Sequence, residues 1–322
     1  MIYLKFYQSV VSILGAINSN INIAVAVSGG ADSLALCFLF DKLVKEHGGN
    51  FCCVTIDHQL RRESSSEAQK VNEILNYHNI KHYILPWIGE KPKANIQENA
   101  RIARYKLLAD FCKQHSIGYL ATGHQKNDQA ENFIIRLEHG SGIYGLSGIP
   151  PMTNLNGVTV IRPLLKFSKE ELQGFLVSEG IKWIEDPSNQ NEHFARVRIR
   201  KVLSQYPGFI DKIATASINL SRAKEVVEYM LQNSLNDLVN YPQSNIATFS
   251  FDKFNQLPQE IKFRMLAKLL QEIGSNLKPA RGERIENLIA KIEAGISFKA
   301  STLGGCLIQR KREQIIITRE VS

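Results

Sequence analysis

The residues best suited to chemistry lie in one short segment, Ser28-Gly29-Gly30-Ala31-Asp32-Ser33. Two adjacent glycines let the backbone turn its N–H groups toward one point with no Cβ in the way. A helix-like apolar run begins at Ser33, and a helix N-terminus adds unpaired N–H groups and a partial positive charge. The segment therefore predicts a binding site for an anion, and a phosphate group is the first candidate.

The residues that are missing narrow the kind of phosphate loop. A Walker loop needs a lysine beside its Ser or Thr, and no lysine lies between Asn18 and Asp41. The G-x-G-x-x-G dinucleotide fingerprint is absent as well. Asp32 stands where a carboxylate could face Mg²⁺, and Ser33 stands where a hydroxyl could donate to phosphate. A Gly-Gly turn without chemistry is the alternative, but the strand–SGGxDS–helix pattern resembles the ATP-binding loop of the ATP pyrophosphatase family, which cleaves ATP between its α- and β-phosphates.

A second group of polar residues comes later in the chain. Asp128 and Glu131 stand three positions apart at the expected start of a helix, so their carboxylates share one face. They predict a negative pocket for a metal ion or an ammonium group, with helix capping as the alternative for Asp128. His124 could act as an acid or base near neutral pH, or be structural. Arg101 could meet a phosphate through its guanidinium fork, or form a surface pair with Glu98.

Alternating strand-like and helix-like segments must position these residues. Strands are expected at 23–27, 50–57, 82–85, 117–122 and 158–165, with helices ending at Tyr77 and spanning 95–115 between them. This alternation predicts an α/β fold with a doubly wound parallel sheet, whose ligands lie over the carboxyl ends of the strands. Residues 140–148 are too rich in glycine for a regular element and are expected to form a loop beside the site. The segment 168–171 is a capping box that opens another helix.

The rest of the chain predicts a smaller and mainly helical second domain. Helical periodicity marks 210–238, 258–273 and 281–294, and 304–319 is expected to form a hairpin with Arg310, Lys311 and Arg312 at its turn. We expect a catalytic domain at 1–205, and a linker helix followed by the small domain at 206–322.

Charge and cysteine content limit the partners and the compartment. The chain of 322 residues carries a net charge of +8. The part after residue 205 has 16 basic and 12 acidic residues, and so holds +4 of that charge. Basic character shared by both parts favours one large anionic partner. The 5 cysteines form no C-x-x-C pair, so reduced thiols and a cytoplasmic location are expected. The first 20 residues are expected to form a helix, and no apolar run reaches membrane-spanning length.

Several motifs in order carry a closer resemblance. They are the SGGADS segment, Asp57-His58-x-Leu-Arg-x-Glu-Ser, the 123–131 segment with Asp128 and Glu131, Arg162-Pro163-Leu164-Leu165, Glu185-Asp186-Pro187-Ser188-Asn189 and Arg196-x-Arg-Ile-Arg. Together they resemble the tRNA(Ile)-lysidine synthetase family over about the first 200 residues. The segment from Leu257 onward is also similar to that family's small helical domain. No part of these 322 residues resembles the further C-terminal domain with which longer members recognise the tRNA acceptor stem.

The resemblance implies a fold of the adenine-nucleotide α-hydrolase type and a two-step ligase reaction. ATP activates the C2 oxygen of the wobble cytidine in a CAU-anticodon tRNA(Ile), and free L-lysine then displaces AMP to form lysidine. It implies roles for three sets of residues: ATP binding by Ser28, Gly29, Gly30, Ala31, Asp32 and Ser33, with Asp32 facing Mg²⁺; catalysis and lysine binding by Asp32, Arg101, His124, Asp128 and Glu131; RNA contacts by Arg196, Arg198 and Arg200. The resemblance is compatible with a homodimer.

Two other classes of function remain open. A tRNA thiolase would share the fold, although it would use cysteine or iron–sulfur chemistry for which the sequence offers no C-x-x-C pair. A non-catalytic tRNA-binding module would be expected to lose Asp32, Ser33, Asp128 or Glu131, and all four are present. An amidotransferase-linked synthetase would need a glutaminase domain for which the chain has no room.

Overall fold

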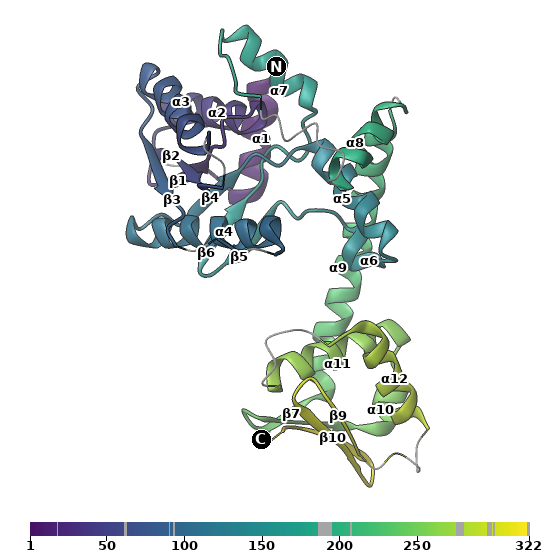
Figure 1. The fold of residues 1–322 in the computed structure, drawn as a ribbon. Helices are drawn as coiled ribbons and strands as arrows, with labels where there is room; N and C mark the ends of the chain where they lie inside the picture. Colours follow the sequence, from purple (N-terminus) through teal and green to yellow (C-terminus); the bar gives the residue numbers. More distant parts are fainter. Residues whose placement is uncertain are drawn as a thin grey trace. The chain divides into compact units, whose positions relative to one another are not determined.

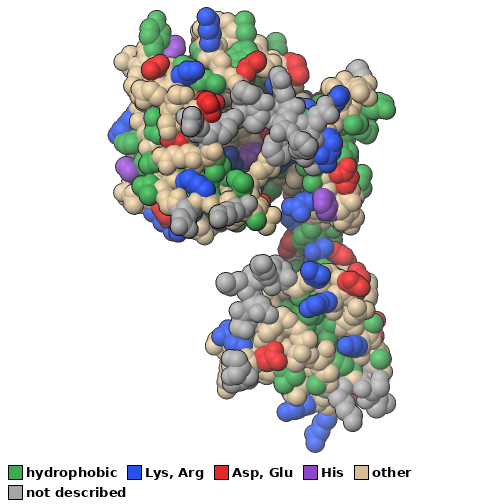
Figure 2. All heavy atoms as spheres, in the orientation of Figure 1, with side chains coloured by type: hydrophobic (Ala, Val, Ile, Leu, Met, Phe, Trp, Pro, Cys, Tyr) green, Lys and Arg blue, Asp and Glu red, His purple; other side chains and the backbone are tan. Residues whose placement is uncertain are grey.

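The structure is a computed structural model, and it describes residues 1–17, 19–60, 63–89, 91–92, 94–185, 195–206, 208–274, 280–294, 298 and 300–320. The chain forms two compact units, Met1–Ser221 and Arg222–Ser322 (Figure 1). Among the helices that are described, none combines the length and apolar character needed to cross a membrane. Lys and Arg side chains are visible on both units and are mixed with acidic and apolar ones on the face shown in Figure 2.

The first unit is built on a six-stranded sheet in the order β3-β2-β1-β4-β6-β5. The strands are β1 (Asn22–Ala26), β2 (Asn50–Asp57), β3 (His82–Pro86), β4 (Tyr119–Thr122), β5 (Met152–Leu155) and β6 (Val158–Ile161). All neighbours are parallel except β5 and β6, which are antiparallel. The doubly wound parallel sheet is therefore confirmed, with one antiparallel edge strand that the sequence did not reveal.

Helices cover both faces of this sheet. They are α1 (Ile2–Leu14), α2 (Ala31–His47), α3 (Ser64–Tyr77), α4 (Ile96–Gln114) and α7 (Lys169–Ser178). Alternate residues of the central strands point to opposite faces, as in any strand: Ile23 and Val25 pack with α1, α2, α3 and α7, whereas Ala24 packs with α4. Helix α2 is apolar on nearly all sides because it lies against the sheet and under its neighbours, and each of its fully buried Leu and Phe side chains contributes about 1.5–3 kcal/mol.

A small cluster of helices stands beside the sheet. It contains α5 (Lys126–Glu138), α6 (Ile143–Leu146), α8 (Ala195–Ser204) and the start of α9 (Phe209–Leu238). Ala130, Ile199, Leu203 and Ile213 form its apolar centre. The prediction of a structureless loop at 140–148 was wrong in part, since a single helical turn, α6, forms there. Its N-cap is Gly142, and the N–H of Leu146 donates to the Gly142 carbonyl.

The second unit packs helices on a five-stranded antiparallel sheet in the order β7-β8-β11-β10-β9. Its elements are β7 (Asn240–Gln243), β8 (Ile246–Ser250), α10 (Phe251–Asn255), α11 (Gln259–Ile273), α12 (Gly282–Glu293), β9 (Ala300–Leu303), β10 (Cys306–Lys311) and β11 (Gln314–Arg319). The predicted hairpin is confirmed as β10–β11, and the predicted helices are α11 and α12. The three further strands were missed, because each is only four or five residues long.

Candidate functional site

A cavity of about 1300 Å³ opens at the carboxyl ends of β1, β2 and β4 in the first unit. Its wall is made by the glycine loop before α2, by the end of β4 and the start of α5, and by residues of α4, α7 and α8. Ligands of doubly wound sheets lie at this edge, because the loops that leave parallel strands converge there. The cavity is therefore the candidate active site.

The glycine loop is fixed by steric demands at Gly29. Its φ of +86° lies in the region that favours glycine, and a Cβ there would come within 2.8 Å of Val71 Cγ2. The Gly29 carbonyl accepts a hydrogen bond of 2.9 Å from the N–H of Ile184, which ties the loop to the segment after α7. Gly30 meets no such restriction, since a Cβ would find only Ser28 Oγ at 3.8 Å. The turn thus depends on the first glycine of the pair.

Ser33 holds the loop together from inside. Its hydroxyl donates to the Gly30 carbonyl at 2.9 Å and accepts from the Ser28 N–H at 3.1 Å. The Ser28 hydroxyl oxygen lies 3.2 Å from the Ser33 hydroxyl oxygen. The sequence suggested that Ser33 donates to phosphate, but in this structure its proton is engaged within the loop. Ser28 and the N-terminal N–H groups of α2 are left to face an anion.

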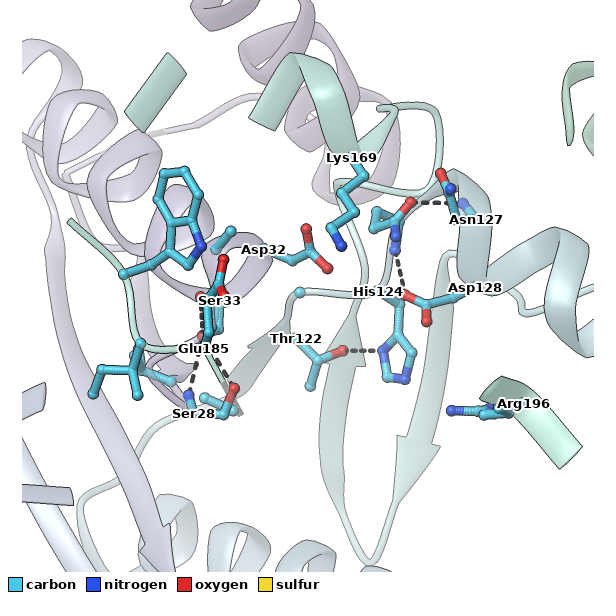
Figure 3. Close-up of a pocket in the computed structure, with 18 of the residues that line it drawn as sticks. Ser28, Asp32, Ser33, Thr122, His124, Asn127, Asp128, Lys169, Glu185 and Arg196 are labelled. Carbon is cyan, nitrogen blue, oxygen red and sulfur yellow. Dashed lines mark hydrogen bonds between the residues drawn. The ribbon is translucent and has the colours of Figure 1, made fainter. Parts of the chain in front are cut away.

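Asp32 projects into the cavity from the first turn of α2 (Figure 3). Its Oδ1 is buried and has no hydrogen-bond partner among the described residues. Burial, followed by the charge of Asp128, raises the pKa of Asp32 to about 6. An unpaired buried carboxylate oxygen beside a phosphate loop is a site that fits a divalent cation, because Mg²⁺ takes one or two carboxylates and completes its shell with phosphates and water.

Asp128 and Glu131 lie together on the first turns of α5, as their spacing predicted. Asp128 also caps the helix, since its Oδ2 accepts from the N–H of Gln125 at 2.9 Å. Glu131 is 1% exposed and its Oε1 accepts from Arg200 Nε at 2.8 Å. Burial, partly offset by the Gln125 hydrogen bond, raises the pKa of Asp128. The acidic pocket thus exists, and the Arg200 guanidinium from α8 is already bound to Glu131, its more buried carboxylate.

The side of the cavity next to α4 is basic. Arg101 and Arg104 line it, and their guanidinium carbons lie 5.2 and 5.0 Å from the Tyr105 ring centre. His124 lies at the end of β4, with Nδ1 2.9 Å from Thr122 Oγ1. Burial and the nearby arginines, Arg162 first among them, lower the pKa of His124 to about 3. The imidazole is therefore neutral at physiological pH.

The end of β2 presents Asp57, a carboxylate whose pKa is shifted in the opposite direction to those of Asp32 and Asp128. Asp57 accepts from the hydroxyls of Ser64 and Ser65 at 2.6 Å each and from the Gln59 N–H at 3.0 Å. Burial would raise the pKa of Asp57, but these hydrogen bonds outweigh it and lower the pKa. Asp57 is thus a structural anion that fastens the start of α3. The adjoining wall is apolar, made by Ala26, Val54, Ile56, Trp183 and Ile184, and suits the flat face of a base.

The structure brings most of the predicted residues to one cavity. Its lining includes Ser28, Gly30, Ala31, Asp32, Ser33, Arg101, His124, Asp128, Glu131, Arg196 and Arg200. Arg198, on α8, is exposed and does not line it. The motif residues Arg61, Asp186, Pro187, Ser188 and Asn189 lie outside the described residues. Lys169 and Arg104 were missed, because Lys169 belongs to a segment interpreted only as a capping box and Arg104 lies in a helix of which only Arg101 was singled out.

Comparisons with known proteins find a matching domain family and similar proteins. The PP-loop domain family matches residues 3–206. The chain is 36% identical over 317 residues to the tRNA(Ile)-lysidine synthase of Orientia tsutsugamushi, covering 95% of this chain and 71% of that protein. It is 35% identical over 321 residues to the synthase of the same name from Wolbachia pipientis, covering 98% and 74%.

A solved structure shares the fold. The U34-tRNA thiolase of Methanococcus maripaludis, which carries a [4Fe-4S] cluster, aligns with a TM-score of 0.58 at 18% identity, over 68% of this chain and 79% of that one. At this identity the likeness supports the α/β fold and no particular activity. The family match and the long, well-covered relatives decide the assignment: the chain belongs to the tRNA(Ile)-lysidine synthase family of PP-loop, ATP-dependent ligases.

Proposed function

We propose that this protein joins L-lysine to C2 of the wobble cytidine in a CAU-anticodon tRNA(Ile), through an adenylated tRNA intermediate. The observation that carries the proposal is the division of one cavity into a phosphate loop with a buried unpaired carboxylate oxygen and an acidic pocket that already holds a cation. The first part suits a nucleotide, and the second suits an amino acid with a positive side chain.

In the first step the C2 oxygen of cytidine attacks the α-phosphorus of ATP, and the bond to the β-phosphate breaks to release pyrophosphate. The N–H groups at the start of α2 and Ser28 orient the phosphates. Asp32 would hold Mg²⁺ through its unpaired Oδ1. When bound, the ion neutralises phosphate charge. Arg101 and Arg104 provide positive charge on the α4 side, where an RNA phosphate would be accepted.

In the second step the ε-amine of lysine attacks C2 of the cytidine, and AMP leaves. Asp128 and Glu131 would bind the incoming ammonium, which takes the place of the Arg200 guanidinium on Glu131. The amine must lose a proton before it attacks, and the Asp128 carboxylate, whose pKa is raised mainly by burial, is suited to accept it. The neutral His124 imidazole, whose pKa of about 3 makes it a weak base, lines the same cavity as a hydrogen-bonding group.

The cytidine must leave the anticodon stack for its edge to reach this cavity, which is the usual way in which bases of single-stranded loops are recognised. Arg196 and Arg198 on α8 would contact the RNA backbone. The catalytic role falls to the first unit, and the second, with its exposed basic hairpin, would bind a further part of the tRNA. The substrates place the reaction in the cytoplasm.

The test is a reconstituted reaction with ATP, L-lysine and a CAU-anticodon tRNA(Ile) transcript. Mass analysis of the nucleosides should show lysidine, with AMP and pyrophosphate formed in equal amounts. A matched transcript with uridine at the wobble position should remain unmodified. Unmodified cytidine with the correct transcript would contradict the proposal, and a thiolated product in a parallel mixture with sulfide in place of lysine would favour the thiolase alternative.

A further inference from the structure

Lys169 is a cavity residue that neither the sequence motifs nor the proposed reaction uses. It is the first residue of α7, directly after the N-cap Ser168. Its side chain lines the cavity, and Figure 3 shows its ammonium group pointing into the same space as the Asp32 carboxylate. Lys169 therefore delivers a positive charge to the phosphate-loop part of the cavity, from an element far from the loop in sequence.

The position of Lys169 is unfavourable for helix stability. A cation in the first turn opposes the partial positive charge of the helix N-terminus. The capping box does not need its side chain, because the Glu171 N–H donates to Ser168 Oγ at 3.2 Å and the Ser168 N–H donates to Glu171 Oε2 at 2.8 Å. The neighbouring carboxylate of Glu171 is engaged with Lys5 at 2.6 Å. Local structure thus gives no reason for a lysine here.

Among the residues that the structure describes, no hydrogen bond or ion pair holds the Lys169 ammonium. Its charge nonetheless acts on Asp32: burial and Asp128 raise the pKa of Asp32, and Lys169 is the strongest influence in the opposite direction. A half-buried cation that faces a phosphate loop, and that no described residue pairs, suits an anionic ligand.

The following groups of the cavity are less suited than Lys169 to bind an anion beside Asp32 and the glycine loop. Arg200 is paired with Glu131 at 2.8 Å. Arg101 and Arg104 belong to α4, which covers the opposite face of the sheet from α2 and α7. Ser33, the hydroxyl of the loop itself, donates to the Gly30 carbonyl. Among the described residues, Lys169 is thus an unpaired cation next to Asp32 on the α2 face.

We propose that Lys169 binds the β- and γ-phosphates of ATP and the pyrophosphate that they become, so that α7 supplies the lysine which the glycine loop lacks. The inference rests on the proposed cleavage between the α- and β-phosphates. When that bond breaks, its electron pair passes to the β-phosphate oxygen, and the leaving group gains negative charge. An ammonium with three donors next to that oxygen stabilises the charge through charge-assisted hydrogen bonds.

The test compares Lys169→Met, which keeps the length of the side chain, with Lys169→Arg and with Lys166→Met at an exposed position in the same segment. Titration calorimetry with magnesium pyrophosphate, without tRNA, should show about 10- to 100-fold weaker binding for Lys169→Met, the loss expected for one charge-assisted contact. Binding of AMP, which has no β-phosphate, should change less than twofold. The Lys169→Arg variant should recover part of the affinity, and Lys166→Met should match the wild type.

The kinetic arm follows pyrophosphate release with the full reaction mixture. For Lys169→Met we expect kcat/KM for ATP to fall at least tenfold, while KM for lysine stays within twofold and the thermal midpoint is unchanged or higher. Unchanged pyrophosphate affinity, an equal loss of AMP affinity, or a rise confined to KM for lysine would each overturn the inference. If the wild type releases no pyrophosphate, it is the proposed function that fails, whereas the calorimetric comparison still decides the role of Lys169.

Discussion

Replacing Asp32 by asparagine should stabilise the protein while it removes activity. The carboxylate has a pKa of about 6 in the folded protein against an ordinary value of 3.8, because burial and Asp128 oppose its ionisation. A folded-state pKa above the unfolded one means that the ionised carboxylate costs stability. The cost is complete above pH 6, shrinks as the pH falls from 6 to 4, and is absent below that window. Asparagine keeps the volume and removes the charge.

The expected gain in the free energy of unfolding follows from the pKa shift of Asp32. One pKa unit corresponds to about 1.4 kcal/mol, so the shift of Asp32 sets an upper figure of about 3 kcal/mol at pH 8. The amide of asparagine keeps polar atoms that need partners in the cavity, and about 1 to 3 kcal/mol is expected. In a unit of 221 residues each kcal/mol moves the melting temperature by about 2–4 °C. The variant should therefore melt about 2 to 12 °C higher at pH 8.

The assay is urea unfolding of ligand-free protein in the presence of EDTA, at pH 8 and at pH 4. Asp110→Asn, on the exposed side of α4, serves as the matched control and should change stability by less than 0.5 kcal/mol. ATP-dependent pyrophosphate release should be nearly abolished for Asp32→Asn only. A variant that is less stable than the wild type at pH 8, or equally stabilised at both pH values, would refute the electrostatic reasoning. Pyrophosphate release by Asp32→Asn at the wild-type rate would show that Asp32 does not serve the ATP site.

Two further predictions concern the acidic pocket and the hairpin. Glu131→Gln should cut lysidine yield by about 30-fold or more, because it removes one partner of a buried charge pair. Single-turnover pyrophosphate release should stay within threefold of the wild-type rate. Equal losses of lysidine yield and pyrophosphate release would assign Glu131 to the nucleotide. At the hairpin, Arg310 stacks on Phe251 at 3.6 Å, so only the exposed Lys311 and Arg312 are free to meet phosphate. Replacing Lys311 by Ala and Arg312, whose φ is +55°, by Gly should reduce the salt slope of tRNA binding by about one unit per lost contact, and an unchanged slope would exclude these contacts.

Much of the catalytic unit could be predicted from local patterns. The expected strand 50–57 coincides with β2, and the long helix expected at 95–115 is α4, Ile96–Gln114. These succeed because continuous apolar runs and helical spacing are set by burial against the sheet. The glycine loop was found for the same reason, since a buried strand, a tight turn and a helix start follow one another without a gap. What was found is local in sequence.

Features that depend on contacts between distant segments were not predicted. The Arg200–Glu131 pair joins residues 69 positions apart, and only the packing of α8 on α5 brings them together. The edge strand Met152–Leu155 is four residues long and has no fully buried side chain, so its pattern carries little signal. In β7, Pro242 and four exposed positions conceal a strand that exists because β8 pairs with it.

The charges of the cavity explain why its most informative residues break local rules. Asp32 is ionised only at a cost, Lys169 opposes the dipole of its own helix, and Arg200 pairs with a carboxylate buried to 1% exposure. Each charge would be costly if left alone in a site of this depth. Together they divide the cavity into a part beside the glycine loop, which contains Asp32 and Lys169, and a part in which Glu131 binds the Arg200 guanidinium. Because substrates of matching charge would relieve these costs, binding energy can be used to position them.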